Sequence, residues 1–140
     1  MKKSLFTFHH IAVATRSIAQ TKRIFEDFGL GMGRIIHVPS QKVNVCFSQK
    51  EGHPQVELIE PAGEDSPIHN ILSKVGTSPY HLCYQTPELD RASKYLKSLG
   101  FLLINGPSPS NALDDNNICF FYHKHFGLIE VVEMREDEAT

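Results

Sequence analysis

The sequence predicts an α+β fold built from two βαβββ modules that pack together. Residues 8–15, with His10, return in diverged form as residues 79–86, with His81, after an offset of 71. Residues 56–60 recur as residues 129–133, after an offset of 73. Both halves also show the same order of strand-like and helix-like segments. One half has a single apolar face that it cannot bury alone, so two halves must pack within one chain or across a dimer.

The first half reads as a strand, a helix and three further strands. The strand at 6–14 alternates, with His10 on one face and Ile11 on the other. Ser17 is a favourable N-cap for a helix to about residue 28, which Gly29 ends. The apolar stripe of this helix consists of Ile18, Ile24, Phe25 and Phe28. Three strands, separated by turn residues, are predicted at 34–38, 42–48 and 54–60.

The second half follows a short linking helix. Ser66 as N-cap with Pro67 at the first helical position predicts that helix, over 68–74. The expected elements that follow are a strand at 80–86, a helix from Pro87 or Glu88 to Leu99, and strands at 101–105, 117–122 and 127–133. A long polar connection is expected at 106–116. We expect 1–140 to be one domain, with modules at 6–62 and 78–134, a linking helix within 63–77, and a frayed charged tail at 135–140.

Composition indicates an ordinary soluble protein. Of the 140 residues, 41% are hydrophobic and 21% are charged, and the net charge of −2 gives no electrostatic case for binding nucleic acid or an anionic membrane. No apolar run approaches the roughly 20 residues that span a bilayer. The basic start, interrupted by His9, His10 and Arg16, does not match a signal peptide.

Cysteine usage favours a reducing compartment. Cys46, Cys83 and Cys119 are odd in number and not clustered in the sequence. They fit small buried side chains in the cytoplasm better than disulfides or a zinc knot.

Four repeated residues indicate a metal site. His10 matches His81 and Glu57 matches Glu130, and if each strand is placed alike in its half, pseudo-twofold symmetry brings the four side chains towards one point. Two imidazoles and two carboxylates suit a divalent first-row metal such as Zn, Co, Ni, Mn or Fe, with room for water or substrate. A structural zinc site would be richer in cysteine and closed.

Two observations weigh against reading every repeated residue as a ligand. A histidine on an apolar strand is usually a hydrogen-bonded core residue, and Glu60 and Glu133 repeat as well. The histidines without a matched partner, expected to be surface or structural, are His9, His37, His53, His69, His123 and His125. His123 is the candidate exception, because it precedes the strand of Glu130.

Several short motifs carry a resemblance to a known family. They are residues 10–13, 56–61, 63–68, 80–83 and 128–130. Through them the chain resembles the vicinal oxygen chelate superfamily of glyoxalases and dioxygenases, and within it the methylmalonyl-CoA epimerases most closely. The resemblance runs from about residue 6 to residue 133. It implies a curved mixed sheet around a cup, in which His10, Glu57, His81 and Glu130 hold a divalent metal.

The resemblance also implies a reaction. A metal-dependent epimerase or isomerase would deprotonate and reprotonate the α-carbon of a chelated acyl thioester, bound to CoA or to a carrier. Glu57 and Glu130 are the candidate catalytic bases. Dimers are common in the family, so a homodimer is compatible with the resemblance, and the modules can pair within or between chains.

Two loops depart from the epimerase pattern. Epimerases typically have a basic residue before the seventh strand, whereas residues 110–117 here are acidic, with Asp114 and Asp115. The loop before the last strand, residues 123–127, is also changed and shortened. Because CoA carries phosphates that prefer positive charge, the two aspartates argue mildly against free CoA if they face the ligand.

Two other functions stay open at this point. Glutamate at position 57, where some epimerases carry glutamine, also fits a glyoxalase I-like lyase acting on a small dicarbonyl. A non-catalytic, drug-sequestering protein of the same fold is the third reading. Binding members commonly lose ligands, so retention of all four candidate ligands disfavours that reading.

Overall fold

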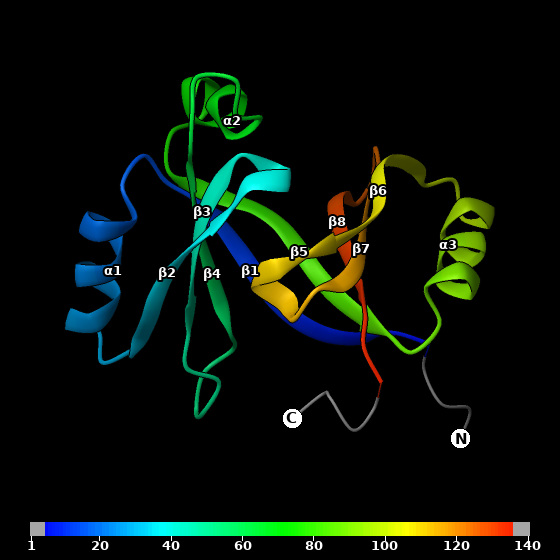
Figure 1. Ribbon diagram of the computed structural model, residues 1–140, viewed down its shortest axis with the longest axis horizontal. Helices are drawn as coiled ribbons and strands as arrows, with labels where there is room; N and C mark the ends of the chain where they lie inside the picture. The colour runs from blue at the N-terminus through cyan, green and yellow to red at the C-terminus, as the bar shows by residue number, and fades with distance from the viewer. Residues whose placement is uncertain (1–4, 136–140) are drawn as a thin grey trace. The chain divides into compact units, whose positions relative to one another are not determined.

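The computed structural model describes residues 5–135, which fall into two compact units (Figure 1). One unit comprises residues 10–80, and the other comprises residues 81–135 together with residues 5–9. Each half of the chain follows the order strand, helix, strand, strand, strand, with a short helix between the halves. The predicted order of elements is therefore confirmed. The predicted module limits stay a prediction, and the tail expected to fray lies, apart from Arg135, outside the described residues.

The first unit is a mixed sheet with helix α1 along one side (Figure 1). Strand β1 pairs in parallel with β4, β4 pairs antiparallel with β3, and β3 pairs antiparallel with β2. The elements are β1 Thr7–Ala14, α1 Ile18–Asp27, β2 Met32–Val38, a 3-10 turn Pro39–Gln41, β3 Val43–Ser48 and β4 Val56–Pro61, followed by α2 Ile68–Lys74.

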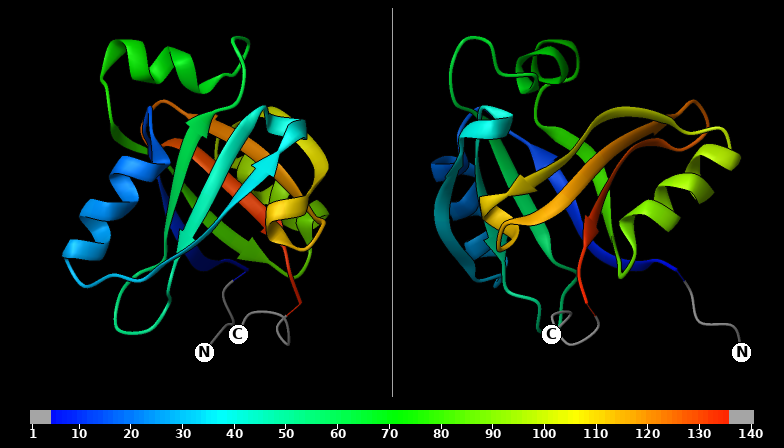
Figure 2. Two further views of the ribbon diagram at one scale, coloured as in Figure 1. Left: turned by 60° about the vertical axis from the view of Figure 1, so that its left-hand side comes forward. Right: turned by 45° about the vertical axis from the view of Figure 1, so that its right-hand side comes forward.

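The second unit repeats this arrangement. Strand β5 pairs in parallel with β8, β8 pairs antiparallel with β7, and β7 pairs antiparallel with β6. Helix α3 packs beside these strands (Figure 2). The elements are β5 Ser78–Thr86, α3 Leu89–Ser98, β6 Leu102–Ser110, a 3-10 turn Asn111–Leu113, β7 Asn116–His123 and β8 Gly127–Glu133.

Each unit buries its own apolar core between its sheet and its helix. Ile18 and Leu58 are buried together in the first unit, and Leu96 and Phe121 in the second. Burying one such side chain contributes about 1.5–3 kcal/mol relative to leaving it exposed. Because Ile11 and Val13 pack on the first core, strand alternation turns His10 to the opposite face of the sheet. The core thereby fixes the face on which the repeated polar residues lie.

The start of the chain packs on the second core rather than the first. Phe6 lies with its ring centroid 6.4 Å from Tyr84 and 6.1 Å from Tyr95. Strand β1 passes from one unit to the other between residues 9 and 10, and β5 does so between residues 80 and 81. His10 and His81 are therefore each the first residue of their strand within the unit that holds the matching glutamate.

The repeated residues Glu60 and Glu133 cap helices. The backbone N–H of Ile18 donates to Oε1 of Glu60 at 3.0 Å, at the start of α1. The N–H of Leu89 donates to Oε2 of Glu133 at 2.8 Å, at the start of α3. A carboxylate at a helix N-terminus satisfies an unpaired donor and complements the helix dipole. The repetition of these two glutamates is thus structural.

Helix α1 also has the predicted cap, but not the predicted stripe. Ser17 accepts a hydrogen bond from the N–H of Gln20 at 3.2 Å. Ile18 is buried, and Phe25, about two turns later on the same face, packs partly against the core. Ile24 and Phe28 are 54% and 79% exposed, so their assignment to the buried stripe is wrong. The helix is short and presents only one narrow face to the sheet.

The long polar connection expected at 106–116 is wrong in its first half. Residues 106–110 continue β6, with Ser108 opposite Ile118 and Ser110 opposite Asn116. Prolines 107 and 109 fit there because, within its unit, β6 pairs only with β7 and its other edge needs no donor. The linking helix spans Ile68–Lys74, as predicted, but its N-cap residue is Pro67 rather than Ser66. The hydroxyl of Ser66 accepts from the N–H of Ile68 at 3.4 Å.

None of the three cysteines forms a disulfide, and all three are buried, as expected. Burial raises the pKa of the Cys46 and Cys119 thiols above the ordinary value of 9.0. Both side chains are therefore neutral and poorly nucleophilic at neutral pH. Among residues 5–135, no helix is long and apolar enough to cross a membrane.

Removing a repeated cap should destabilise the protein without touching the site. We expect Glu60→Ala and Glu133→Ala each to lower the free energy of unfolding by about 1 kcal/mol, because each leaves a helix N–H without its acceptor. Urea denaturation would measure this change, with the exposed Glu64→Ala as control, expected within about 0.5 kcal/mol of wild type. Equal stability of the two cap variants and the control would contradict the capping role.

Burial should also protect the thiols from modification. We expect less than one equivalent of thiol to react with an aromatic disulfide reagent at pH 7 in the folded protein, and three after denaturation. Absorbance of the released thiolate gives the count. Rapid reaction of the folded protein would show that at least one cysteine is exposed.

Candidate metal centre

The first unit holds a buried histidine–glutamate pair. His10 lies on β1 and Glu57 on β4, and the parallel register places Glu57 opposite Ala12, two residues beyond His10. Both side chains therefore share the sheet face opposite the helix. Nε2 of His10 lies 3.3 Å from Oε1 of Glu57, and the two residues are 0% and 5% exposed.

An aromatic ring fixes the imidazole of this pair. Phe47 on β3 lies opposite Glu57 in the antiparallel ladder. Its ring centroid is 5.3 Å from that of His10, and the two planes cross at 80°. Such edge-to-face contacts are favourable and limit ring rotation. The aromatic ring also covers the imidazole, so the Nε2 atom is held toward the carboxylate.

The second unit holds an equivalent pair. Nε2 of His81 on β5 lies 3.3 Å from Oε1 of Glu130 on β8, and the residues are 5% and 3% exposed. Phe120 on β7 lies opposite Glu130, with its ring 5.3 Å from that of His81 and tilted by 77°. Cys83 lies opposite Glu130, as Ala12 lies opposite Glu57. The repeat is thus reproduced in register, in distance and in ring packing.

The donor chemistry of each pair fits a divalent metal. A buried carboxylate is costly unless a cation or a hydrogen-bond donor compensates its charge. Imidazole nitrogen and carboxylate oxygen are both ligands for the borderline first-row metals. Each unit thus holds one imidazole nitrogen and one carboxylate of the four predicted ligands. Structural zinc sites, by contrast, are usually rich in cysteine.

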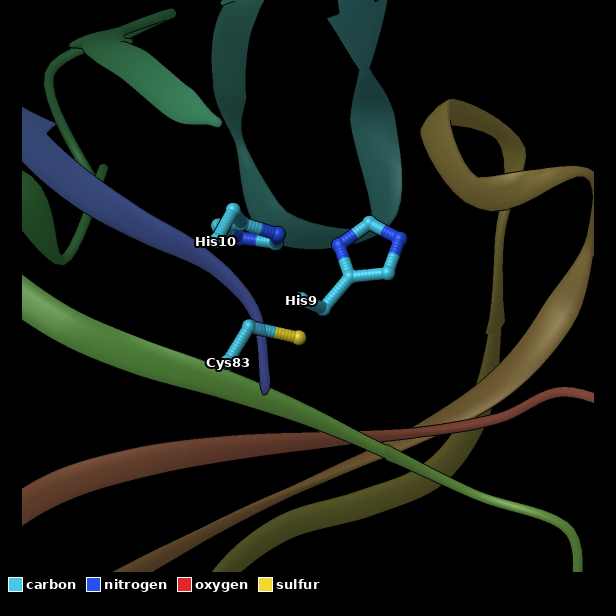
Figure 3. A group of neighbouring side chains, drawn as sticks. All are labelled: His9, His10 and Cys83. Carbon is cyan, nitrogen blue, oxygen red and sulfur yellow. The ribbon is translucent and has the colours of Figure 1, made fainter. Parts of the chain in front are cut away.

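The thiol of Cys83, a soft metal donor, lies close to His9 on β1. Figure 3 shows His9 and His10 at successive positions of β1 and Cys83 on β5. The imidazole of His9 and the sulfur of Cys83 belong to the same unit and lie within 4.8 Å of each other. Cys83 is fully buried, whereas His9 is partly exposed. Sequence reasoning treated His9 as surface or structural and did not relate it to Cys83.

Most of the other histidines are held by local contacts. Hydrogen bonds join His37 to Asn44 at 2.9 Å, His53 to the carbonyl of Pro54 at 2.7 Å and His69 to the carbonyl of Gly63 at 2.8 Å. Nδ1 of His123 accepts from the N–H of His125 at 3.0 Å, and its ring lies 5.0 Å from Phe101. These contacts assign His123 to the β7–β8 turn.

Sequence reasoning missed the two phenylalanines beside the imidazoles. Phe47 and Phe120 repeat with the same offset of 73 as Glu57 and Glu130. Their place opposite the glutamates would follow from pairing the strands in register, a signal already present in the repeat. In the acidic loop, Asp114 and Asp115 are exposed and both have positive φ angles, 56° and 58°.

Comparison with known proteins gives consistent matches. Residues 9–120 match the Glyoxalase/Bleomycin resistance protein/Dioxygenase superfamily. The uncharacterized protein YqjC of Bacillus subtilis is 31% identical over 132 residues, covering 92% of this chain and 93% of that protein. The ethylmalonyl-CoA/methylmalonyl-CoA epimerase of Cereibacter sphaeroides is 25% identical over 130 residues, covering 90% and 96%.

A solved structure shares the fold. The crystal structure of methylmalonyl-CoA epimerase from Mycobacterium tuberculosis has a TM-score of 0.84 and 24% sequence identity, covering 99% of this chain and 95% of that chain. This likeness confirms the predicted fold class, an α+β fold of two βαβββ modules of the vicinal oxygen chelate type.

The matched pairs should bind a divalent metal. We expect cobalt or nickel added to chelator-treated protein to raise its melting temperature, because a ligand at 100 times its Kd stabilises the folded state by about 2.7 kcal/mol. His10→Ala and His81→Ala should each weaken binding by more than the roughly 10–100-fold typical of losing a residue that only supports a ligand. Calorimetric titration measures the affinity.

The control for this experiment is His53→Ala, which removes an exposed histidine outside both pairs. It should bind metal like the wild type. Absence of metal from protein purified without chelator, together with an unchanged melting temperature on adding cobalt and nickel, would overturn the metal hypothesis.

Proposed function

This chain belongs to the Glyoxalase/Bleomycin resistance protein/Dioxygenase superfamily, and from that premise we propose that it is a metal-dependent epimerase or isomerase. The proposed reaction removes and returns the proton on the α-carbon of an acyl thioester. The observation that carries the proposal is the pair of matched, buried histidine–glutamate sets at 3.3 Å. Similarity over nearly the whole chain to proteins named as methylmalonyl-CoA epimerases supports the reaction class.

The proposed ligands are His10, Glu57, His81 and Glu130, acting together on one divalent cation. Zinc, cobalt, nickel, manganese and iron all accept this mixture of nitrogen and oxygen donors. The equal geometry of the two units supports a shared site, since duplication of a half-site is useful when both halves contribute to one ion. When bound, the cation would supply Lewis acidity that makes a C–H beside a carbonyl easier to ionise.

The chain's own residues would then move the proton. Glu57 and Glu130 are the proposed bases, because each is a buried carboxylate beside the proposed ligand histidine. One carboxylate would take the α-proton, and the other, protonated at the start, would deliver its own proton to the opposite face of the carbon, inverting its configuration. Both carboxylates would then return to their starting states by exchanging protons with water. Phe47 and Phe120 would hold the imidazoles in place during this exchange.

The proposed substrate is a small acyl thioester on CoA or on a carrier protein. One solved structure of similar fold, at 22% sequence identity, is that of a methylmalonyl-CoA epimerase in complex with methylmalonyl-CoA. The exposed acidic pair Asp114 and Asp115 lies where epimerases typically carry a basic residue. Negative charge repels the phosphates of CoA, which favours the carrier-bound form. We propose a cytoplasmic location, with which three buried cysteines that form no disulfide are consistent. We also propose a homodimer, which is common in the family.

The second candidate is a glyoxalase I-like lyase acting on a small dicarbonyl. The specific observation in its favour is a glutamate, rather than a glutamine, at Glu57. A drug-sequestering function without catalysis is disfavoured, because both histidine–glutamate pairs are intact.

Exchange of the α-proton into deuterated water tests the epimerase proposal. We expect metal-loaded protein to exchange the α-proton of methylmalonyl-CoA or of a carrier-bound analogue, followed by mass spectrometry. Glu57→Gln and Glu130→Gln should each slow exchange by at least about 100-fold for one configuration of the substrate and spare the other. This split is expected because each base serves one face of the carbon.

The control variant is Glu60→Gln, since Glu60 caps a helix and does not belong to the pairs. Exchange of both configurations by Glu57→Gln would show that Glu57 is a ligand only. No exchange by the wild type with either substrate would refute the epimerase, and turnover of a glutathione–methylglyoxal adduct would then support the lyase.

A further inference from the structure

The two histidine–glutamate pairs differ in the residues beside them. In the first unit, the parallel register places Gln55 next to His10, and the N–H of Ile11 donates to the carbonyl of Gln55 at 3.1 Å. Gln49 follows the last residue of β3, and its N–H donates to the carbonyl of Gly31 at 2.9 Å. We call Gln55, Gln49 and Gly31 the polar row.

The equivalent residues of the second unit are apolar. Leu128 lies next to His81, Tyr122 is opposite Leu128, and Leu102 is opposite Tyr122. Leu128 and Tyr122 stand 73 residues after Gln55 and Gln49, and Leu102 stands 71 residues after Gly31. These are the offsets of the glutamates and the histidines. We call Leu128, Tyr122 and Leu102 the apolar row, of which Tyr122 and Leu102 are 44% and 65% exposed.

The amide of Gln55 has a defined orientation. Its Nε2 donates to the carbonyl oxygen of Ser48 at 3.2 Å. A carbonyl oxygen only accepts, so the opposite assignment of the amide atoms would put two acceptors together. The Oε1 atom is consequently turned away from Ser48. It is buried and accepts no hydrogen bond from any residue between 5 and 135.

The end of the polar row is shaped by a glycine. A Cβ at Gly31 would overlap the amide of Gln49, so a side chain there would move this exposed amide from its present position. The missing side chain therefore makes room for the amide of Gln49. In the second unit Leu102 stands at this position, and Tyr122 replaces the amide. Gln55 and Gln49 in the first unit thus correspond to Leu128 and Tyr122 in the second.

A buried acceptor without a donor is unfavourable, so a ligand that supplies the donor gains that hydrogen bond on binding. We infer that the polar row is the hydrogen-bonding subsite of the proposed metal site, with Gln55 Oε1 accepting from an N–H or O–H of the substrate. This rests on the proposed function, because it requires that the sheet face of His10 binds the substrate.

The inference narrows the substrate class. A 2-alkylmalonyl thioester carries no N–H or O–H beside its chelating oxygens at neutral pH. Within the proposed acyl thioesters, Gln55 therefore points to one with a hydroxyl or amide group next to the chelating atoms, for which methylmalonyl-CoA would serve only as an analogue.

Two hydroxamates provide the test. Acetohydroxamate and N-methylacetohydroxamate both chelate divalent metals through two oxygens, but only the first carries an N–H donor. Calorimetry on nickel-loaded protein should give binding of acetohydroxamate that is about three- to tenfold tighter, the effect of one net hydrogen bond. Gln55→Leu, which copies the apolar row, should remove this preference. Leu128→Gln, the matched change in the second unit, should keep it.

The outcomes separate this inference from the proposed function. Suppose that both hydroxamates bind to the nickel-loaded wild type. The inference is wrong if the wild type shows no preference for acetohydroxamate, or if Gln55→Leu keeps the same preference as the wild type. If neither compound binds although nickel is held, the sheet face does not bind chelating ligands, and the proposed function fails with it. A thermal melt of Gln55→Leu shows whether the variant is folded. Gln55→Asn, whose shorter side chain withdraws the amide oxygen, should also lose the preference.

Discussion

Each half of the molecule depends on one parallel strand pair, β1 with β4 in the first unit and β5 with β8 in the second. Both pairs have the same register, with the glutamate opposite the residue two positions after the histidine. A slip of one residue would turn every side chain of β4 to the other face, placing Glu57 in the helix-side core. The register that buries the apolar residues therefore also brings the histidine and the glutamate to 3.3 Å.

Strand β4 carries both a glutamate of the histidine–glutamate pair and a glutamate that caps a helix. Glu57 and Glu60 are three residues apart on β4, so their side chains lie on opposite faces of the sheet. Glu57 meets His10, while Glu60 accepts the first N–H of α1. The duplication copied both assignments, which explains why the sequence repeats four glutamates although only two lie beside a histidine. The cap anchors the helix to the strand that carries the candidate ligand.

Symmetry holds for the pairs and fails beside them. The histidines, glutamates and phenylalanines agree in identity and distance between the units. The neighbouring positions have diverged, from Gln55 and Gln49 to Leu128 and Tyr122. Gln55 and Leu128 therefore give two otherwise matched units different chemistry beside their histidines.

The sequence by itself determined the module order and the histidine–glutamate set, because each half of a repeat corroborates the other and strand alternation assigns the faces. It misjudged β6, since proline and serine are typical of loops and only an edge position tolerates them in a ladder. It also could not place Phe47 against His10 or orient the buried amide of Gln55. Those facts depend on contacts between strands distant in sequence, where packing alone decides which atoms are covered and which hydrogen bonds are made. The repeat of His10 and His81 identifies the candidate site in the sequence, and the tertiary structure determines which side chains surround each histidine.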